Sequence, residues 1–284
     1  MSDFVALLGT KGGPMIRPGS TMPTSSLLDL GGQRVVVDCG LGVARGLTGQ
    51  GMSLKDLSLI FITHLHSDHY LELGPLLHTA WCAGLRTSVQ VWGPPGLDLY
   101  WQGFVASMAF DIETRIEDEG RPDVRALVSI HETTPDAPMV FGALTVTAIR
   151  TLHPPLTDCF AYRFQTADKA VVFSGDTARL HALETFASGA DLLIHEAMLA
   201  PALPALMARI GNGDDRLMRH WLRAHTTAED AAKTAAAAGV KALALHHLIP
   251  SDAPEFTEAD WLNDTTPHFS GKIHIGTDGL RIPL

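Results

Sequence analysis

The stretch FITHLHSDHY places three histidines and one aspartate within six positions, directly after the apolar run LSLIFI. The apolar run predicts a buried strand. Residues i, i+2 and i+4 of an extended segment point the same way, so we expect His64, His66 and Asp68 to converge. His69 is expected to open the helix that follows. Because zinc and similar ions prefer imidazole and carboxylate ligands, this stretch predicts part of a metal site at a strand end.

Three more apolar strands are expected to end in residues of the same ligand types. ALTVTAIRTLHPP delivers His153, KAVVFSGDT delivers Asp176, and VKALALHHLIP delivers the pair His246 and His247. With the first stretch, these strand ends supply seven ligands, which is enough for two adjacent cation sites bridged by one aspartate. Strand alternation puts the two neighbouring histidines on opposite faces and does not decide which of them is the ligand.

Short β-rich apolar runs recur along the whole chain, with helical patterns between several of them. Strands follow one another in the first half, whereas strands and helices alternate in the second. Helices are expected at residues 70–83, 97–113, 178–187 and 214–238. This mixture predicts a four-layer αββα sandwich of two packed sheets with helices outside. No low-complexity linker divides residues 1–284, so we expect a single domain.

The net charge and the first ten residues limit which partners and which cellular compartment are expected. The formal net charge of -10 disfavours nucleic acid, because phosphate binding rests on clustered lysine and arginine. Residues 1–10 have no basic lead, and no apolar stretch is long enough to span a bilayer, so we expect a cytoplasmic protein with no membrane partner. The three cysteines are isolated, which argues against a disulfide framework or a thiolate zinc site.

The ordered set of HLHSDH, a lone histidine, SGDT and a C-terminal histidine resembles the metallo-β-lactamase superfamily over nearly the whole chain. The resemblance implies an αββα sandwich with a dinuclear site at one edge of the sheets. It implies two divalent metals, most simply zinc, with manganese or iron as alternatives. The first metal would be held by His64, His66 and His153, the second by Asp68, His69 and His247, and Asp176 would bridge them.

Two further features follow from the family pattern. The family usually places a small polar residue before its last ligand, which favours His247 over His246. It also commonly keeps an aspartate after an early strand to support the ligands, and this role would fall to Asp38 in VVVDCG. A strand-end turn residue is the alternative for Asp38.

The stretches GADLLIHEAM and AHTTAEDAAK resemble the ribonuclease Z branch, which includes a group of arylsulfatases. By this resemblance, Glu196 and His225 form a hydrogen-bonded pair that donates a proton to the leaving group, and the protein is a homodimer. A strand-end carboxylate and a helix-start histidine are the structural alternatives. The bridging Asp176 disfavours a true β-lactamase, and His66 disfavours a flavodiiron oxygen reductase, which typically has glutamate there.

The ligand set predicts a hydrolase in which a hydroxide bridging the two metals attacks the ester. Asp68 and Asp176 would orient the hydroxide, and His225, held by Glu196, would protonate the departing alkoxide.

The substrate is expected to be small. Ribonuclease Z carries a long basic arm that grips transfer RNA, but only residues 154–160 fill the corresponding place here. With the negative net charge, this favours small phosphodiesters or related aryl sulfate esters and makes nucleic acid an unlikely partner. The alternatives are a lactonase or other carboxylic ester hydrolase, a ribonuclease Z-like RNA-processing endonuclease, and a catalytically silent metal-binding protein.

Two loops and one helix face complete the expected site. The Gly/Pro-rich residues 9–23 and the segment 197–213 are expected to form an apolar substrate wall, with core packing as the alternative. A basic stripe at helical spacing is expected to face solvent, opposite a face that carries Trp221, Leu222 and His225. The stripe consists of Arg216, Arg219, His220 and Arg223.

Overall fold

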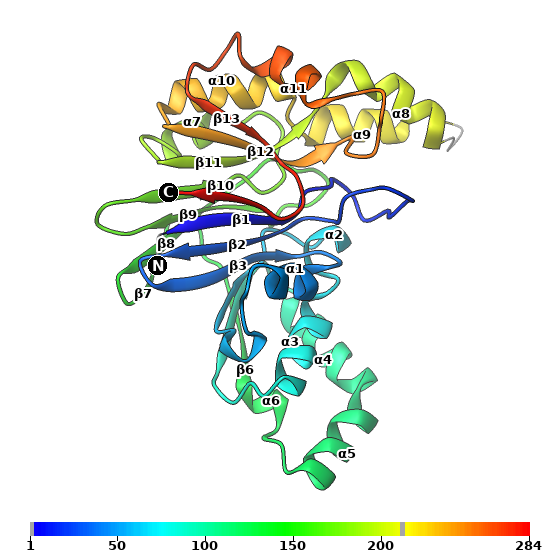
Figure 1. Cartoon of the computed structure of the whole chain (residues 1–284), viewed down its shortest axis with the longest axis vertical. Helices are drawn as coiled ribbons and strands as arrows, with labels where there is room; N and C mark the ends of the chain where they lie inside the picture. The colour runs from blue at the N-terminus through cyan, green and yellow to red at the C-terminus, as the bar shows by residue number, and fades with distance from the viewer. Residues whose placement is uncertain (1–2, 211–213) are drawn as a thin grey trace.

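Two mixed sheets lie face to face with helices on both outer sides (Figure 1). The computed structural model describes residues 3–210 and 214–284. Within these residues each sheet has seven strands, in the orders β14-β1-β2-β3-β4-β5-β6 and β13-β12-β11-β10-β9-β8-β7. The four-layer α/β sandwich predicted from the sequence is therefore confirmed.

Each sheet combines antiparallel and parallel pairs. In the first sheet, β14–β1, β1–β2 and β2–β3 are antiparallel, and β3–β4, β4–β5 and β5–β6 are parallel. In the second, β7–β8, β8–β9 and β9–β10 are antiparallel, and β10–β11, β11–β12 and β12–β13 are parallel. The first sheet contains β1 Phe4–Gly9, β2 Ser25–Leu30, β3 Gln33–Cys39, β4 Leu59–Phe61, β5 Val89–Gly93, β6 Val128–Glu132 and β14 Leu280–Pro283. The second contains β7 Met139–Phe141, β8 Leu144–Arg150, β9 Phe160–Gln165, β10 Ala170–Phe173, β11 Leu192–Met198, β12 Ala242–Ile249 and β13 Lys272–Ile275.

Helices cover the outer face of each sheet. Those of the first half are η1 Leu54–Asp56, α1 Val43–Gly49, α2 Ser67–Tyr70, α3 Leu73–Cys82, α4 Leu97–Ser107, α5 Ala109–Glu119 and α6 Val124–Leu127. Those of the second half are α7 His181–Phe186, η2 Ala200–Ala202, α8 Leu203–Ile210, α9 Arg216–Ala224, α10 Ala228–Ala238 and α11 Glu258–Thr265. In the described residues, no helix combines the length and the apolarity that a membrane crossing requires.

The single helix expected over residues 214–238 is wrong, because the chain leaves the helix between α9 and α10. His225 has extended backbone angles, φ −129° and ψ 161°. Thr227 then caps α10 by accepting a hydrogen bond from the Asp230 backbone N–H at 3.1 Å. The Thr226 hydroxyl donates to the Thr177 carbonyl at 2.6 Å, which ties the break to the loop after β10. The break places His225 at the sheet edge instead of inside a helix.

A cluster of aromatic rings fills the space between the sheets. Phe61 at the end of β4 lies edge to face with Phe141, Tyr162 and Phe164, at centroid separations of 6.0, 5.0 and 5.2 Å. Such pairs add stabilisation beyond the area they bury. Because Phe61 is fully buried and belongs to the first sheet while its partners belong to the second, it joins the two sheets next to the first histidine stretch.

Replacing Phe61 with alanine should lower the free energy of unfolding by about 3–5 kcal/mol, because the cavity left between the sheets cannot close. Phe110→Ala is the matched control, since the Phe110 side chain is 88% exposed and its loss should change stability by about 0.5 kcal/mol or less. Urea unfolding of the metal-free protein measures both. A similar small loss for the two variants would contradict this account of the core.

Candidate metal centre

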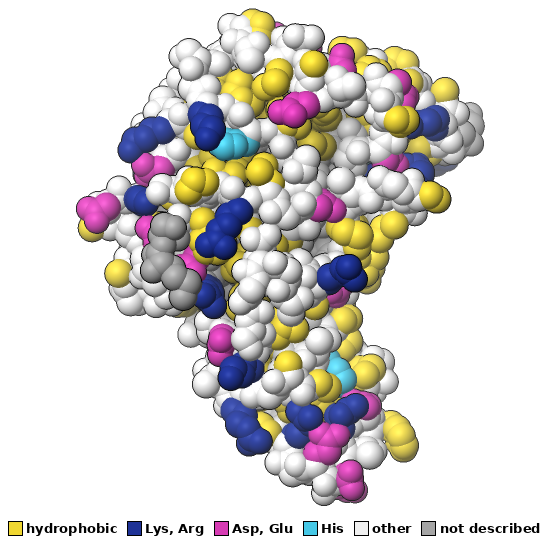
Figure 2. All heavy atoms as spheres, in the orientation of Figure 1, with side chains coloured by type: hydrophobic (Ala, Val, Ile, Leu, Met, Phe, Trp, Pro, Cys, Tyr) yellow, Lys and Arg dark blue, Asp and Glu magenta, His cyan; other side chains and the backbone are white. Residues whose placement is uncertain are grey.

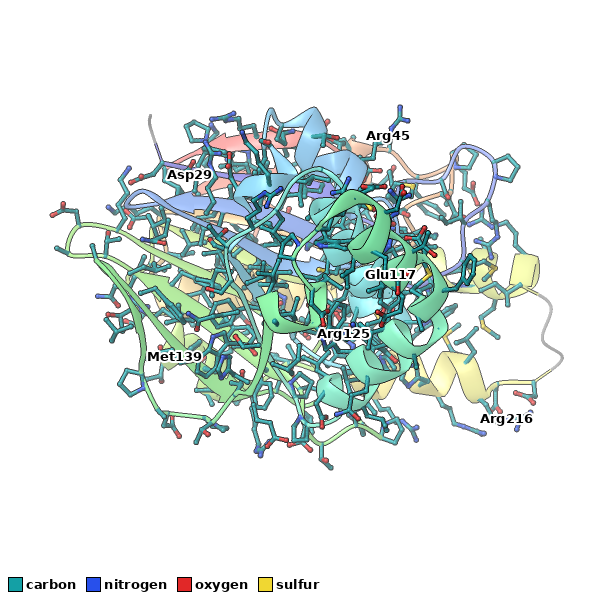
Figure 3. The ribbon with its side chains drawn as sticks, turned by 90° about the horizontal axis from the view of Figure 1, so that it is seen from below. Asp29, Arg45, Glu117, Arg125, Met139 and Arg216 are labelled. Atoms are coloured by element: carbon teal, nitrogen blue, oxygen red, sulfur yellow. The ribbon has the colours of Figure 1, made fainter. Side chains whose placement is uncertain are left out.

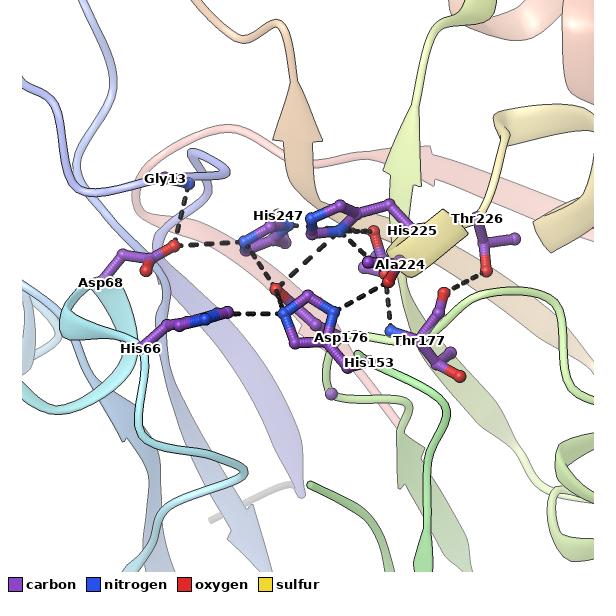
Figure 4. A network of polar contacts seen from close by, with 12 residues as sticks. Gly13, His66, Asp68, His153, Asp176, Thr177, Ala224, His225, Thr226 and His247 are labelled. Atoms are coloured by element: carbon purple, nitrogen blue, oxygen red, sulfur yellow. Dashed lines mark hydrogen bonds and ion pairs between the residues drawn. The ribbon is translucent and has the colours of Figure 1, made fainter. Parts of the chain in front are cut away.

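The seven predicted ligands meet at one edge of the two sheets, after the ends of β4, β8 and β10 and near the end of β12. Figure 4 shows five of them: His66, Asp68, His153, Asp176 and His247. Among the described residues, four groups of candidate ligand atoms lie within 4.8 Å of one another. Two of them hold only predicted ligands: His64, His66, His153 and Asp176, and Asp68, His69 and His247. The other two groups are His153, His220 and His225, and Asp176, Glu196, His225 and His247. The first two groups follow the two triads that the sequence suggested.

Asp176 lies between the two triads. Its Oδ2 atom is 3.2 Å from His247 Nε2, 3.5 Å from His69 Nε2 and 3.7 Å from His64 Nε2. Burial alone would raise the pKa of this carboxyl, but the charges available on His247, His69 and His64 hold it well below its usual range. A buried, ionised carboxylate in contact with both triads has the position that a bridging ligand needs.

The donor set fits divalent cations. Among the described residues, three buried polar atoms of the cluster have no hydrogen-bond partner: His69 Nε2, Asp176 Oδ1 and His247 Nδ1. Such atoms are costly when left unpaired, and a bound cation would satisfy His69 Nε2 and Asp176 Oδ1. In the first triad, His66 Nδ1 lies 3.1 Å from His64 Nε2 and 3.0 Å from His153 Nε2, so three ring nitrogens converge. Nitrogen and carboxylate donors in this arrangement are typical of divalent metal sites.

Residues behind the triads fix the orientation of the rings. Asp38 Oδ2 bonds His69 Nδ1 at 2.8 Å, and Asp38 Oδ1 accepts the Thr63 backbone N–H at 2.8 Å. His153 Nδ1 bonds the Ala224 carbonyl at 2.8 Å. Partners of this kind set the tautomer of a ligand histidine. Asp38 adopts φ 61°, a conformation that costs energy for a residue other than glycine. Its contacts with His69 and Thr63 hold it in that conformation behind the ligands.

A β-bulge separates the roles of His246 and His247. In the pairing of β11 with β12, Glu196 lies opposite His246 and Ala197 opposite Leu248, so His247 is an extra residue with φ 47°. The bulge turns the His247 ring into the cluster, whereas His246 Nε2 bonds the Gly9 carbonyl at 2.8 Å. Strand alternation could not choose between the two because the alternation breaks at this point.

The loop after β1 lies directly on the second triad. The Gly13 backbone N–H donates to Asp68 Oδ2 at 2.9 Å. A Cβ on Gly12 would lie 2.5 Å from Ile249 Cγ1 and 3.0 Å from the His247 ring, so the loop can approach this closely because residue 12 is glycine.

Glu196 and His225 form the pair that the sequence suggested. His225 Nδ1 lies 2.9 Å from Glu196 Oε2 and 3.1 Å from Oε1, and the Thr177 backbone N–H donates to Oε1 at 2.7 Å. Burial and the neighbouring Asp176 charge raise the pKa of Glu196, and burial lowers the pKa of His225. The pair lies beside Asp176, with His225 Nδ1 3.9 Å from Asp176 Oδ2.

A cavity of about 310 Å³ opens over the cluster. One side is formed by His66, Asp68, Asp176, His225 and His247. The apolar part of its lining comprises Leu206, Ile210, Leu217, Trp221 and Ile249. Residues from both predicted wall segments, 9–23 and 197–213, line the cavity, although residues 211–213 lie outside the described part of the chain. Several of the wall residues also pack against one another, so the wall is at the same time a small core.

Two features of this cavity differ from the expectations drawn from the sequence. His220 lines it, although the basic stripe was expected to face solvent as a whole, and Leu222 is 58% exposed, although it was placed on the inner face. Figure 3 shows Arg216 at the periphery, as expected. The inner face of α9 has the spacing Leu217, His220, Trp221 and Ala224, and this i, i+3, i+4, i+7 pattern could have located His220.

The second feature is an ionic cluster in the cavity lining, in which two basic residues of the loop after β1 pair with Asp252. Asp252 Oδ2 lies 2.6 Å from Arg17 Nη1 and 3.5 Å from Lys11 Nζ. All three residues line the cavity. Their positions are distant in the sequence, and no motif links them.

Residues 33–248 match the family described as "Beta-lactamase superfamily domain". The chain belongs to this family, and with its His/Asp clusters it is a metal-dependent hydrolase of the metallo-β-lactamase superfamily.

Two mycobacterial relatives are named Ribonuclease Z. "Ribonuclease Z" of Mycobacterium sp. (strain KMS) is 34% identical over 99% of this chain and 95% of its own length. "Ribonuclease Z" of Mycobacterium bovis (strain BCG / Pasteur 1173P2) is 30% identical over 99% of this chain and 98% of its own. The solved structures include the metallo-β-lactamase fold protein YhfI of Bacillus subtilis, with TM-score 0.73, 22% identity and 99% of each chain covered. The short form of human tRNase Z has TM-score 0.68 and 20% identity, with 99% of this chain and 100% of that chain covered.

Replacing each of the two adjacent histidines in turn tests whether the bulge selects His247 as the ligand. His247→Ala should lower bound metal well below that of the wild type, because it removes a ring that faces both Asp68 and Asp176. His246→Ala should keep its metal, since that ring bonds the Gly9 carbonyl outside the clusters. Elemental analysis after purification in zinc measures both variants. Equal metal content in the two would show that the bulge does not select the ligand.

Proposed function

We propose that this chain is a phosphodiesterase that works with two divalent metal ions, most simply zinc. The observation that carries the proposal is the Asp176 carboxylate, which lies within 3.8 Å of ring nitrogens from both triads. The first triad offers three ring nitrogens, and the second offers two ring nitrogens and a carboxylate, all donors of the kind that zinc prefers. Two metals held on either side of one carboxylate suit phosphoryl chemistry, in which the attacking and the leaving oxygen both need stabilisation.

The proposed roles of the side chains follow from their contacts. When bound, the metals would supply Lewis acidity and an activated water at neutral pH. Asp68 orients that water, since the pKa of Asp68 is lowered by His69 and His247 despite its burial and the carboxylate stays ionised. Burial raises the pKa of Glu196 and lowers that of His225, so the Glu196 carboxyl keeps its proton and donates it to Nδ1 of His225, which leaves the N–H on the other ring nitrogen. As the bond between phosphorus and the leaving oxygen breaks, His225 gives the proton of that N–H to the oxygen. When that nitrogen gives up its proton, the Glu196 proton passes to Nδ1 and the ring stays neutral.

Two substrate classes are compatible with this chemistry, and the relatives favour RNA. The mycobacterial relatives named Ribonuclease Z match over at least 95% of their own length. The short segment at residues 154–160 is therefore a weaker argument against RNA than the sequence alone suggested. Their names also weigh against the expectation that nucleic acid is an unlikely partner, and we propose an RNA phosphodiester as the first candidate substrate.

The cavity keeps small phosphodiesters as the second candidate. Its volume of about 310 Å³ lies at the small end of ligand pockets, which run from about 300 to 1,000 Å³. The net charge is -10, and Figure 2 shows basic side chains interspersed with acidic ones on the face drawn there, without a continuous basic surface. A substrate that places one compact, partly apolar group against Trp221 and Leu217 would fit, whether it is a small diester or the end of an RNA strand. Neither the relatives nor the geometry favours an aryl sulfate or a lactone.

Further properties stay predictions. We propose that residues 1–284 work as a single domain, because the core between the sheets draws on residues from Val5 to Ile282. A homodimer and a cytoplasmic location rest on the sequence analysis alone. Sedimentation of the purified protein measures the first of these.

The zinc-loaded protein should cleave phosphodiesters faster than sulfate esters or lactones of the same leaving group. A panel of chromogenic esters, with unstructured and folded RNA alongside, measures this preference. RNA cleavage that weakens steeply with salt would assign the RNA substrate, whereas cleavage of small diesters alone would assign the second candidate. Faster cleavage of lactones than of every phosphodiester would contradict the proposal.

Removing the proton donor should matter most for poor leaving groups. His225→Ala should lower kcat by about 10²–10⁴-fold with an alkyl diester and far less with a nitrophenyl diester, whose leaving oxygen needs no proton. Glu196→Gln should show the same dependence more weakly. Rate measurements across a series of leaving groups give the slope for each protein. A loss that is uniform across the series would remove His225 from the role of proton donor.

A further inference from the structure

His220 is a histidine of the catalytic cavity that the proposed ligand set and proton donor do not use. It lies on α9, is half-buried and lines the cavity beside the metal cluster. Its ring centroid is 5.6 Å from that of His225, 5.8 Å from His153 and 6.3 Å from His66. The ring therefore lies over the first triad and next to the proposed proton donor.

The ring nitrogens of His220 are available to a ligand. Among the described residues, His220 makes ring contacts with its neighbouring histidines, and no hydrogen bond or ion pair engages its nitrogens. By contrast, the ring of His225 is bonded to Glu196 and that of His153 to the Ala224 carbonyl. An imidazole carries at least one N–H in either protonation state, so His220 presents a free donor to the cavity.

The helix around His220 holds the ring in this place. Trp221, the next residue, is buried among the apolar residues of the cavity wall, and Leu217, one turn earlier, packs against the same group. The flanking Arg219 instead projects outward and pairs with Asp215 at 2.7 Å. Because the inner face of α9 is fixed by these contacts, the ring of His220 is directed at whatever occupies the space over the triad.

We propose that His220 donates a hydrogen bond to a non-bridging oxygen of the scissile phosphoryl group, an inference that rests on the proposed function. A phosphodiester has two non-bridging oxygens, and one of them can face the cavity wall, where His220 offers an unengaged donor beside the first triad. His225 serves the leaving oxygen, so the two histidines of this region have separate targets. The donor stabilises the negative charge that grows on phosphoryl oxygens during the reaction.

A binding experiment tests the contact without relying on turnover. Inorganic phosphate is titrated into the zinc-loaded protein by calorimetry. His220→Ala should raise the Kd for phosphate by about 10- to 100-fold, as expected for a lost hydrogen bond to a charged group. His220→Gln, which retains an N–H donor, should recover part of the affinity. His181→Ala is the control, since that side chain is 83% exposed and lies on α7, and it should bind phosphate as the wild type does.

Kinetics separate this role from those of the ligands and of His225. His220→Ala should keep its metal and lower kcat/KM by about 10²- to 10³-fold. The loss should be the same for good and poor leaving groups, unlike the loss in His225→Ala. Diesters in which sulfur replaces one non-bridging oxygen exist as two stereoisomers. The loss of kcat/KM in His220→Ala should be larger for one of these stereoisomers than for the other.

The outcomes distinguish the two proposals. If the wild type cleaves no phosphodiester, the proposed function falls, and phosphate binding still decides the role of His220. Unchanged phosphate affinity in His220→Ala would overturn the inference. Loss of metal in that variant would also overturn it, because His220 would then be a ligand. A rate loss that grows with the basicity of the leaving group would assign His220 to proton donation instead.

Discussion

The site depends on a buried negative charge that needs positive partners. Asp176 is 2% exposed, and a carboxylate removed from water in this way is strongly unfavourable unless cations or hydrogen-bond donors surround it. Histidines from β12, from the segment after β4 and from the loop after β8 supply those partners, and a cation between them would do so more fully. The two sheets must therefore meet with their strand ends aligned, and cation binding is coupled to the stability of this edge.

The same constraint explains the conformations around the site. Asp38 and His247 both have positive φ angles, and each has a partner that requires that conformation: His69 for the first, and the Asp68 and Asp176 pair for the second. Strained residues persist where the surrounding contacts over-determine them. Among the described residues, two of the three non-glycine residues with positive φ therefore lie at the second triad: His247 belongs to it, and Asp38 orients His69.

Much of the site could be predicted from the sequence because its ligands stand at the ends of recognisable strands. Neighbouring residues reveal both the ligand type and the strand position, as in the apolar runs that precede His64 and Asp176. What could not be predicted depends on partners that are distant in the chain. The bulge at His247 exists because β12 slips against β11, and the break before Thr227 exists because Thr226 bonds the loop after β10. The position of His220 was missed for another reason: the charged stripe was given more weight than the apolar face of the same helix.

Anomalous diffraction at the zinc edge, from crystals of the zinc-loaded protein, tests the central claim most directly. The account predicts two peaks, one bounded by His64, His66 and His153 and the other by Asp68, His69 and His247, with Asp176 contacting both. Peaks elsewhere, or no peak between these side chains at full zinc loading, would contradict it.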